Sequence, residues 1–251
     1  MSAYEPLIGA ILVVLFAVIT LAWSRKKGQK MSGPVFRSMP GVERLRKAVG
    51  LAVEDGTRVH VALGSGNVND PSCPSAFCGL AILEKVGQIT ATSDLHPMST
   101  SGSGGFQILA QDVINQNAAF TNFTERVDAT LCQLGGVTPF AYAAGTLEAL
   151  RESGVSTEIY LGDFGSEAGL LCENAHRRQT HNLAGSNSMT GQAVFLALAK
   201  DALIGEEVFA LPAYLAKKPS HLASLSAQDL FRFLLVLVLL AGALLKLAGL
   251  L

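Results

Sequence analysis

Each end of the 251-residue chain carries a long apolar run that is almost free of charge. At the amino end, LIGAILVVLFAVITLAW follows Pro6 and closes at Trp23. Its length of about 17 to 19 residues is close to what spans a hydrocarbon core of ~30 Å. At the carboxyl end, FLLVLVLLAGALLKLAGLL runs from Phe233 to Leu251 with Lys246 as its one charge. These runs predict one transmembrane helix at each end of the chain.

The charges around the first run predict its direction. The leading segment MSAYEP holds Glu5 and no basic residue, whereas a cleaved signal peptide has a positive leading region. Basic residues follow the run instead and favour the cytoplasmic side. We therefore expect a retained anchor in the cell (inner) membrane, with both termini outside and the domain between the spans in the cytoplasm. The basic residues that set this direction are Arg25, Lys26, Lys27 and Lys30.

The segments that enter the two spans differ in stiffness. Ser226 with Asp229 has the spacing of a capping box, and neither Gly nor Pro interrupts the chain from there to Ala241. This predicts a helix that begins in the cytoplasm and continues into the bilayer. Lys27–Pro40 contains two Gly and two Pro and predicts a pliable linker. The predicted divisions are an anchor at 1–30, a linker at 31–40, a domain at 41–225 and a carboxyl-terminal transmembrane helix at 226–251.

The central segment alternates short β-branched runs with longer helical patterns. Strands separated by helices of about 10 or more residues predict βαβ crossovers, and hence a parallel sheet with helices on both faces. The expected fold is a doubly wound, Rossmann-like α/β domain flanked by the two transmembrane helices. The predicted strands are RVHVALG (58–64), QITATSD (88–94), RVDATLC (126–132), STEIYLGDF (156–164) and HNLAGS (181–186).

Small and polar residues follow four of these strands. In parallel sheets, ligands bind beyond the carboxyl ends of the strands, so these residues are candidates for one ligand-binding rim. Strand-to-helix turns also need Gly, Ser, Asp and Asn without any ligand, so a purely structural role is the alternative. The candidates are Gly64, Ser65, Gly66, Asn67, Ser93, Asp94, His96, Asp163, Ser166, Glu167 and Ser186.

Sequence motifs do not assign a reaction to this rim. Gly64-x-Gly66 lacks a third glycine because position 69 is Asn, and STSGSGG has no Lys-Ser/Thr to complete a phosphate-binding loop. No G-x-S-x-G sequence is present. Asp94, Asp163 and Glu167 are candidates to gather with His96 for acid–base catalysis, which is the alternative to the expected non-catalytic role.

Composition limits the partners. The formal net charge is −1, which disfavours nucleic acid as a partner because phosphate binding needs clustered positive charge. The 4 cysteines form no C-x-x-C pair and have no His at zinc spacing, so no metal site is expected and the thiols are expected to be buried and reduced. No cofactor is expected either. The expected partners are the lipid bilayer and either a second copy of the chain or another membrane protein.

Three stretches resemble an uncharacterised bacterial membrane-protein family that is described as a domain of unknown function. They are RVHVALGSG, FAYAAGTLEALRESGVSTEIYLGDFGSEAGLL and IGEEVFALPAYLAKKPSHLASLSAQDLFRFLL. The resemblance covers nearly the whole chain from Gly41 onward and is most specific between Gly205 and Phe233. It implies an amino-terminal anchor, an α/β domain and a carboxyl-terminal span, and it implies no activity.

Three functions are compatible with the sequence. The leading hypothesis is a non-catalytic, membrane-anchored scaffold or accessory subunit that forms a homo-oligomer or recruits a partner. The apolar segment GEEVFALPAYLAKK, with charge at both ends, is the predicted partner surface. The alternatives are a cytoplasmic sensor of a small ligand or nucleotide, and a hydrolase or transferase, both of which would use the strand-end rim.

Overall fold

The computed structural model describes residues 5–27, 37–93, 95–120, 129–151, 153–216 and 218–247. Two compact units divide the chain. One comprises Met1–Ser38 with Lys217–Leu251, and the other is Met39–Ala216. The predicted linker falls mostly on residues 28–36, which lie outside the described part of the chain.

The Met39–Ala216 unit is built on a six-stranded sheet in which all strands are parallel. The order β3-β2-β1-β4-β5-β6 means that the chain moves outward from β1 and then returns to its other side for β4. The sheet therefore has its topological switch point between β1 and β4. This confirms the predicted parallel α/β fold. The strands are β1 (Arg58–Gly64), β2 (Met98–Ser101), β3 (Cys132–Leu134), β4 (Val155–Asp163), β5 (His181–Ser186) and β6 (Asp201–Leu203).

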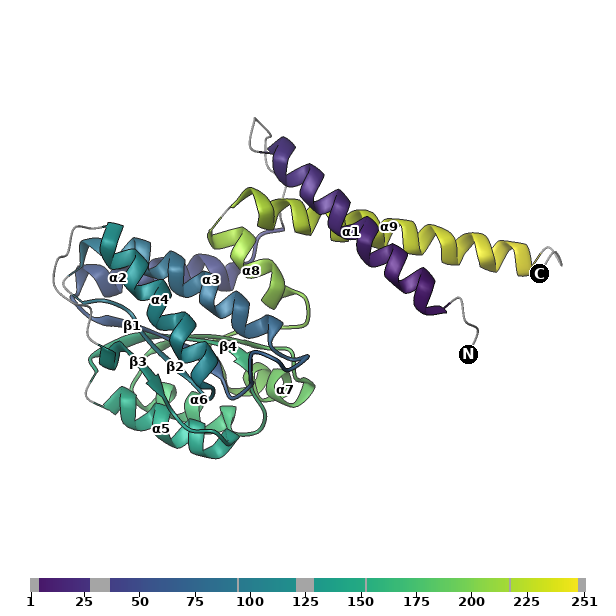
Figure 1. Ribbon diagram of the computed structural model, residues 1–251. Coiled ribbons are helices and arrows are strands. Elements are labelled where there is room, and N and C mark those ends of the chain that lie inside the picture. The colour runs from purple at the N-terminus through teal and green to yellow at the C-terminus, as the bar shows by residue number, and fades with distance from the viewer. Residues whose placement is uncertain are drawn as a thin grey trace. The chain divides into compact units, whose positions relative to one another are not determined.

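Helices cover both faces of the sheet (Figure 1). Val59, Val61 and Leu63 alternate along β1 and join one apolar core, while Ala62 joins the core on the opposite face. This alternation follows from the period of two in a β-strand. The first core packs under α2 (Pro40–Glu54), α3 (Pro74–Ile89), α4 (Gly104–Phe120) and α8 (Glu207–Leu215), and the second lies under α5 (Pro139–Arg151), α6 (Ala168–Arg177) and α7 (Met189–Leu198).

The second strand does not lie where the sequence predicts it. Gln88 and Ile89 belong to the end of α3, and Thr90–Thr92 form a short 3-10 helix, η1. The Thr90 hydroxyl donates to the Val86 carbonyl at 3.0 Å and extends the helical turn. The true strand, β2, has the sequence MSTS, and all four of its residues are buried. Its polar composition concealed it in the sequence, because polar residues are usually found at the surface. The hydroxyl groups can be buried here because they are hydrogen-bonded to neighbouring groups.

The third and sixth strands also differ from the prediction. Residues 126–128 of the predicted strand RVDATLC lie outside the described residues, and Ala129–Leu131 form a 3-10 helix, η2. Strand β3 begins only at Cys132. The sequence did not predict β6, which has three residues and no periodic pattern to detect.

The predicted partner surface on GEEVFALPAYLAKK is contradicted. Val208, Leu211 and Leu215 of α8 are buried in the core of their own domain, so the apolar face of this helix is already covered. Pro212 lies inside α8, and the helix continues to Leu215.

The other unit contains α1 (Glu5–Lys27) and α9 (Pro219–Leu247). Among the described residues, α9 is the one helix whose length and composition suffice to cross a membrane. The described apolar stretch of α1, Gly9–Arg25, is shorter than a membrane span. One span at the carboxyl end therefore agrees with the sequence prediction, whereas a span at each end does not follow from these helices.

Helix α9 starts earlier than the sequence predicts. It begins at Pro219, and Ser226 lies inside it with its hydroxyl donating to the Leu222 carbonyl at 2.9 Å. The predicted capping role of Ser226 is therefore wrong, because proline in the first turn provides the helix start. The expected continuity is confirmed, since one unbroken helix runs from Pro219 through the apolar segment to Leu247.

Candidate functional site

Three strand ends meet at the carboxyl edge of the sheet beside the switch point. The Ser65 N–H donates to the Asp163 carbonyl at 3.0 Å, which joins the end of β1 to the end of β4. The Gly102 N–H donates to the Gly64 carbonyl at 2.8 Å, which joins the loop after β2 to the same point. The sequence candidates Gly64, Ser65 and Asp163 are therefore close together, where parallel α/β sheets bind ligands.

Glycines at this edge permit close backbone approach. Gly64 has φ +76°, and a Cβ there would lie 2.4 Å from the Asp163 carbonyl oxygen. A Cβ on Gly162 would lie 2.0 Å from the Leu63 carbonyl oxygen. Both positions need glycine to let β1 and β4 pack against each other. The glycine at position 64 of the candidate rim is thus accounted for by strand packing.

The Asp163 carboxylate is engaged by the loop that follows β1. Its Oδ2 accepts a hydrogen bond from the Ser72 hydroxyl at 3.0 Å. Earlier in the same loop, the Asn67 N–H donates to Asp70 Oδ2 at 2.8 Å and closes a local turn. Val68 is partly buried against the apolar core. These contacts hold the segment from Gly66 to Ser72 beside the switch point.

Glu167 and Ser186 stabilise the turn after β4. Glu167 is 2% exposed, and its Oε1 accepts a hydrogen bond from the Gly165 N–H at 2.7 Å. The buried Ser186 hydroxyl oxygen accepts from the Phe164 N–H at 3.1 Å. Ser166 is exposed between them along the chain. Of these candidates, only Ser166 presents its side chain to solvent, so the group resembles a braced turn more than an acid–base site.

Ser93, Asp94 and His96 do not belong to this rim. They precede β2, so Ser93 and His96 lie toward the amino edge of the sheet, opposite the other candidates. The displacement follows from the true position of β2, which ends at Ser101 and not at position 94 as predicted. The Ser93 hydroxyl oxygen accepts from the Leu95 N–H at 3.4 Å, which is a local turn contact. Asp94 lies outside the described residues.

The carboxyl end of β2 is formed instead by the Gly/Ser segment Ser101–Gly105. The Ser101 hydroxyl donates to the Ser103 carbonyl at 3.0 Å, and α4 begins at Gly104. In the sequence, STSGSGG stands out only as a glycine-rich stretch. The strand–glycine–helix order was the signal that would have placed it on the rim.

A buried polar network, which the sequence analysis missed, leads from this rim into the sheet. The Gly64 N–H donates to the Tyr142 hydroxyl at 3.3 Å, and Tyr142 lies 3.2 Å from the Thr100 hydroxyl. Thr100 in turn lies 2.9 Å from Nε2 of His60, and the Thr146 hydroxyl donates to it at 3.2 Å. His60 lies in the predicted strand RVHVALG. The strand pattern predicts that its side chain is buried, but it does not predict which residue forms a hydrogen bond with it.

Burial keeps this network uncharged at neutral pH. It lowers the pKa of His60 to about 3, with a further contribution from the positive charge of Arg178. Burial also raises the pKa of Tyr142 to about 12. His60 is therefore a neutral imidazole, and neither group exchanges protons in the range where a general acid or base works.

A buried carboxyl lies beside His60 on the same face of the sheet. His60 of β1 and Glu158 of β4 are partners in the strand register, and both side chains are fully buried. The Tyr160 hydroxyl donates to Glu158 Oε2, and the Thr180 hydroxyl donates to Oε1 at 2.8 Å. Burial raises the pKa of Glu158, and the two hydroxyl bonds partly oppose that shift. His60 and Glu158 are not exposed to solvent, so this cluster belongs to the interior of the domain and is not positioned to contact a substrate.

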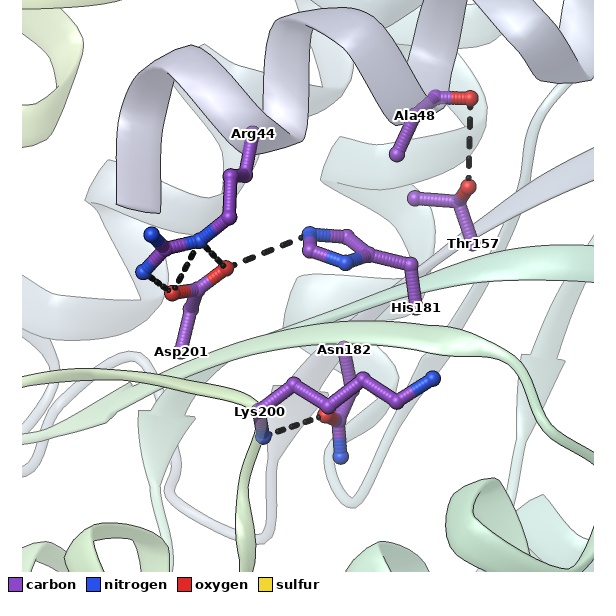
Figure 2. Close-up of polar contacts among 7 residues, drawn as sticks. All are labelled: Arg44, Ala48, Thr157, His181, Asn182, Lys200 and Asp201. Carbon is purple, nitrogen blue, oxygen red and sulfur yellow. Dashed lines mark hydrogen bonds and ion pairs between the residues drawn. The ribbon is translucent and has the colours of Figure 1, made fainter. Parts of the chain in front are cut away.

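An ion-pair cluster fixes α2 to the amino edge of the sheet (Figure 2). Nε of Arg44 donates to both carboxylate oxygens of Asp201, at 2.9 and 3.0 Å. Asp201 is 4% exposed, and its Oδ2 lies 3.5 Å from Nε2 of His181. Burial lowers the pKa of His181, and the charge of Asp201 opposes this shift. The cluster lies at the edge opposite the usual ligand position, so its evident role is to hold α2 on β5 and β6.

Metal and thiol chemistry find little support in the described ranges. No group of three or more His, Cys, Asp or Glu residues is placed there to hold a metal ion. The 4 cysteines are free thiols, and Cys132 and Cys172 are buried. Burial raises the pKa of each of these two to about 12 and that of Cys78 to about 11, which disfavours the reactive thiolate.

Comparison with known proteins gives a family and no activity. A family model described as a domain of unknown function, DUF6754, matches residues 3–250. No curated protein and no solved structure matches the chain. The family match spans the α/β unit together with the helices α1 and α9.

Proposed function

This chain belongs to the DUF6754 family, a domain of unknown function, and we propose that it is a non-catalytic α/β module anchored in a membrane. In this proposal the module assembles with itself or recruits another membrane protein. The role is that of a scaffold or accessory subunit, and it needs a protein surface rather than a reaction centre.

The observation that carries the proposal is an exposed apolar surface at one end of the sheet. Leu134, Val137 and Phe140 are 45%, 75% and 60% exposed, and they follow one another from the end of β3 to the first turn of α5. We call these three residues the β3-edge patch. Apolar side chains gathered on the surface of a domain are typical of a docking surface. Strand β3 is also an edge strand of the sheet that the described residues form.

The state of the strand-end rim supports a non-catalytic role. Asp163, Glu167 and Ser186 each accept hydrogen bonds from the loops that they support. A general acid or base has to be within reach of a substrate proton, and a nucleophile needs an adjacent base. The groups at this edge are arranged to brace turns.

We further propose the membrane arrangement that the charges favour. Helix α9 crosses the bilayer, and α1 makes a second crossing, with both termini outside and the α/β domain in the cytoplasm. Arg25, at the end of α1, is exposed, and basic residues at that end favour the cytoplasmic side. Leu7, Val13 and Val18 of α1 are all more than half exposed, as expected for a helix whose solvent is lipid.

The test is a pair of substitutions in the β3-edge patch of the full chain, Val137→Glu and Phe140→Glu. A charge on this surface should disrupt docking, because its desolvation in an interface is not compensated. We expect detergent-extracted variants to have a lower protein mass by light scattering, or to lose the membrane protein that is cross-linked to the wild type. Leu51→Glu, at an exposed leucine of α2, is the control and should behave as wild type. Wild-type mass and cross-links in both patch variants would contradict the proposal.

A small-ligand sensor is the second candidate, because loops from β1, β2 and β4 converge at the switch point. Binding to the native state would raise the apparent stability of the protein. A panel of nucleotides and anionic metabolites in a thermal-shift assay tests this function. A reproducible shift that Asp163→Asn abolishes would favour the sensor, and the absence of any shift would favour the scaffold.

A further inference from the structure

The outer side of α7 is apolar, although it faces solvent. This helix carries no charged residue from Met189 to Leu198. Met189 and Leu196 are 87% and 67% exposed, and Ala193, also exposed, lies between them on the same side of the helix. A surface helix of a globular domain normally has polar or charged residues on the side that faces solvent. The exposed side of α7 is therefore an apolar stripe that no other described element of this domain covers.

This stripe lies at the β6 edge of the sheet. Helix α7 packs on β5 and β6, and β6 is the last strand on that side of the sheet that the described residues form. Val194 and Leu198 lie against Gly169 of α6, within 4 Å of where its Cβ would be. Met189 and Leu196 are on the opposite side of α7, because successive residues are about 100° apart round a helix. They therefore point away from α6, toward the β6 edge.

The loop after β6 extends the same surface. Ile204 is 38% exposed, and the Gly205 N–H next to it donates to Oε1 of Gln192 on α7 at 3.1 Å. This hydrogen bond holds the loop beside the apolar stripe. We call Met189, Leu196 and Ile204 the β6-edge surface.

The domain thus exposes apolar side chains at both edges of its sheet. Strands β3 and β6 are the two ends of the strand order, so the β3-edge patch and the β6-edge surface lie at opposite edges. Helices α5 and α7 pack over the same core, on one face of the sheet. Each follows a strand and starts at the carboxyl edge, so the two helices run in the same direction.

We infer that the β6-edge surface of one copy of the chain binds the β3-edge patch of a second copy. The inference rests on the proposed self-assembly and names the surface that the patch binds. Because the contact joins two different surfaces, each copy keeps one surface free for a further copy, and assembly continues to a ring or a filament. In this contact α7 of one copy lies beside α5 of the next, with both helices starting at the same edge of their sheets.

Charges of opposite sign lie at matching places along the two helices. Lys200 is exposed just after α7, and its side chain has no hydrogen bond or ion pair with the other described residues (Figure 2). Glu148 of α5 is exposed as well. Lys200 comes eleven residues after Met189, and Glu148 comes eleven residues after Val137. Alignment of the two apolar surfaces therefore brings Lys200 of one copy close to Glu148 of the next, and such charge complementarity favours one partner and one register.

Glu148 is on the side of α5 that is nearer β3. Gly136, in the loop after β3, is so close to α5 that a Cβ there would lie 2.8 Å from the Ala141 Cβ. Glu148 follows Ala141 by seven residues, or about two turns, and so lies on that side. Its ion pair with Arg151 is 3.8 Å long between side chains that are more than 70% exposed, so it contributes little. Arg151 is one turn after Leu147, which packs against the core beneath α6, and it lies farther from the β3 edge.

The composition of the β6-edge surface favours a second copy over lipid as the occupant. Helices that lie on a membrane surface carry several Lys or Arg residues on their polar side. Lys200 is the single basic residue beside α7 from position 188 to position 206. The neighbouring copy offers both an apolar surface for the stripe and a carboxylate for this lysine.

Two blocked variants test the contact in detergent-extracted full-length protein. Leu196→Glu blocks the β6-edge surface and Val137→Glu blocks the β3-edge patch, because a buried glutamate has no compensating partner there. By light scattering, the wild type should contain three or more copies, since two copies cannot cover surfaces at opposite edges, and each variant alone should be a monomer. A mixture of the two variants should form a dimer and nothing larger, because one intact surface of each kind remains. This recovery shows that both variants are folded.

The mixed dimer also provides a matched control for the charge pair. Its contact uses Lys200 of the Val137→Glu copy and Glu148 of the Leu196→Glu copy. Lys200→Glu in the Val137→Glu copy should raise the dissociation constant about fivefold, and Glu148→Lys in the other copy should restore it. The same Lys200→Glu substitution placed in the Leu196→Glu copy lies outside the contact and should have no effect. Equal effects of Lys200→Glu in the two copies would overturn the inferred alignment.

The outcomes separate this inference from the proposed function. A Leu196→Glu variant of wild-type mass, a wild type that is a strict dimer, or a mixture that stays monomeric would overturn this contact alone. The β3-edge patch would then bind itself or another protein. A monomeric wild type that cross-links to no other protein would overturn the proposed function itself.

Discussion

Acidification should destabilise the α/β domain through His60. Burial lowers the pKa of this imidazole to about 3 in the folded protein, against 6.5 for an ordinary histidine, and Arg178 adds to the shift. Between these two values the unfolded chain binds a proton that the folded chain excludes, so stability falls as the pH falls below 6.5. At pH 5, 1.5 units below the unfolded pKa, the loss is about 2 kcal/mol at 1.36 kcal/mol per unit.

Urea unfolding of the full chain in one detergent, followed by circular dichroism at pH 7 and pH 5, measures this loss. His60→Gln cannot titrate, so the loss between the two pH values should be about 2 kcal/mol smaller in that variant than in wild type. Glu158 acts in the opposite direction, because its pKa is raised and its contribution to stability falls as the pH rises above 4.5. The change in the free energy of unfolding between pH 7 and pH 5 is taken for each protein separately, so a loss of stability that is the same at both pH values cancels. The difference between the two changes is then the contribution of His60. His176→Gln, at an exposed position, should match wild type. Equal pH dependence in wild type and His60→Gln would refute the reasoning.

The remaining predictions concern backbone packing, the ion pair at the amino edge and the start of α9. Gly162→Ala places a Cβ 2.0 Å from the Leu63 carbonyl oxygen and should lower the free energy of unfolding by about 3 kcal/mol or more, as measured with urea. In the same assay Gly50→Ala, which meets open space in a helix, should raise it by about 0.5–1 kcal/mol. Arg44→Gln leaves the buried Asp201 carboxylate without its bidentate partner and should lower Tm more than Arg177→Gln, which removes an exposed pair. Ser226→Ala should leave Tm within the scatter of wild type, since this residue is inside α9 and does not cap it. A clear loss of Tm there would restore the capping interpretation.

The sequence was most informative where a strand is apolar, long and bounded by turn residues. Strand β1 was predicted at the residues that form it, and β4 was displaced by one residue. Strand β2 was missed because Thr100 is the one residue of MSTS that is typical of strands. Its burial depends on tertiary partners such as the Val61 carbonyl, which accepts from the Ser99 hydroxyl at 2.9 Å. Three-residue strands such as β6 are too short to leave a periodic signal.

The candidate site depended on those strand ends, so one error propagated. Ser93 and His96 were assigned to the rim only because a strand was predicted before them. With β2 correctly placed, Gly102 and Ser103 take that position. The network of His60, Thr100 and Tyr142 joins residues that are distant in sequence. No local pattern reveals such a network, since each member by itself looks like an ordinary buried residue.

The central claim is that α9 holds this α/β domain at the cytoplasmic face of a membrane. A membrane-impermeant maleimide applied to sealed cells tests it directly, on a chain with Glu173→Cys in a background where Cys73 and Cys78 are replaced by alanine. Glu173 is an exposed residue of α6, so a cysteine there is accessible whenever the reagent reaches the domain. The prediction is no labelling in intact cells, full labelling after permeabilisation, and retention of the protein in the membrane fraction after alkaline carbonate extraction. Labelling of intact cells, or release of the protein by carbonate, would contradict the claim.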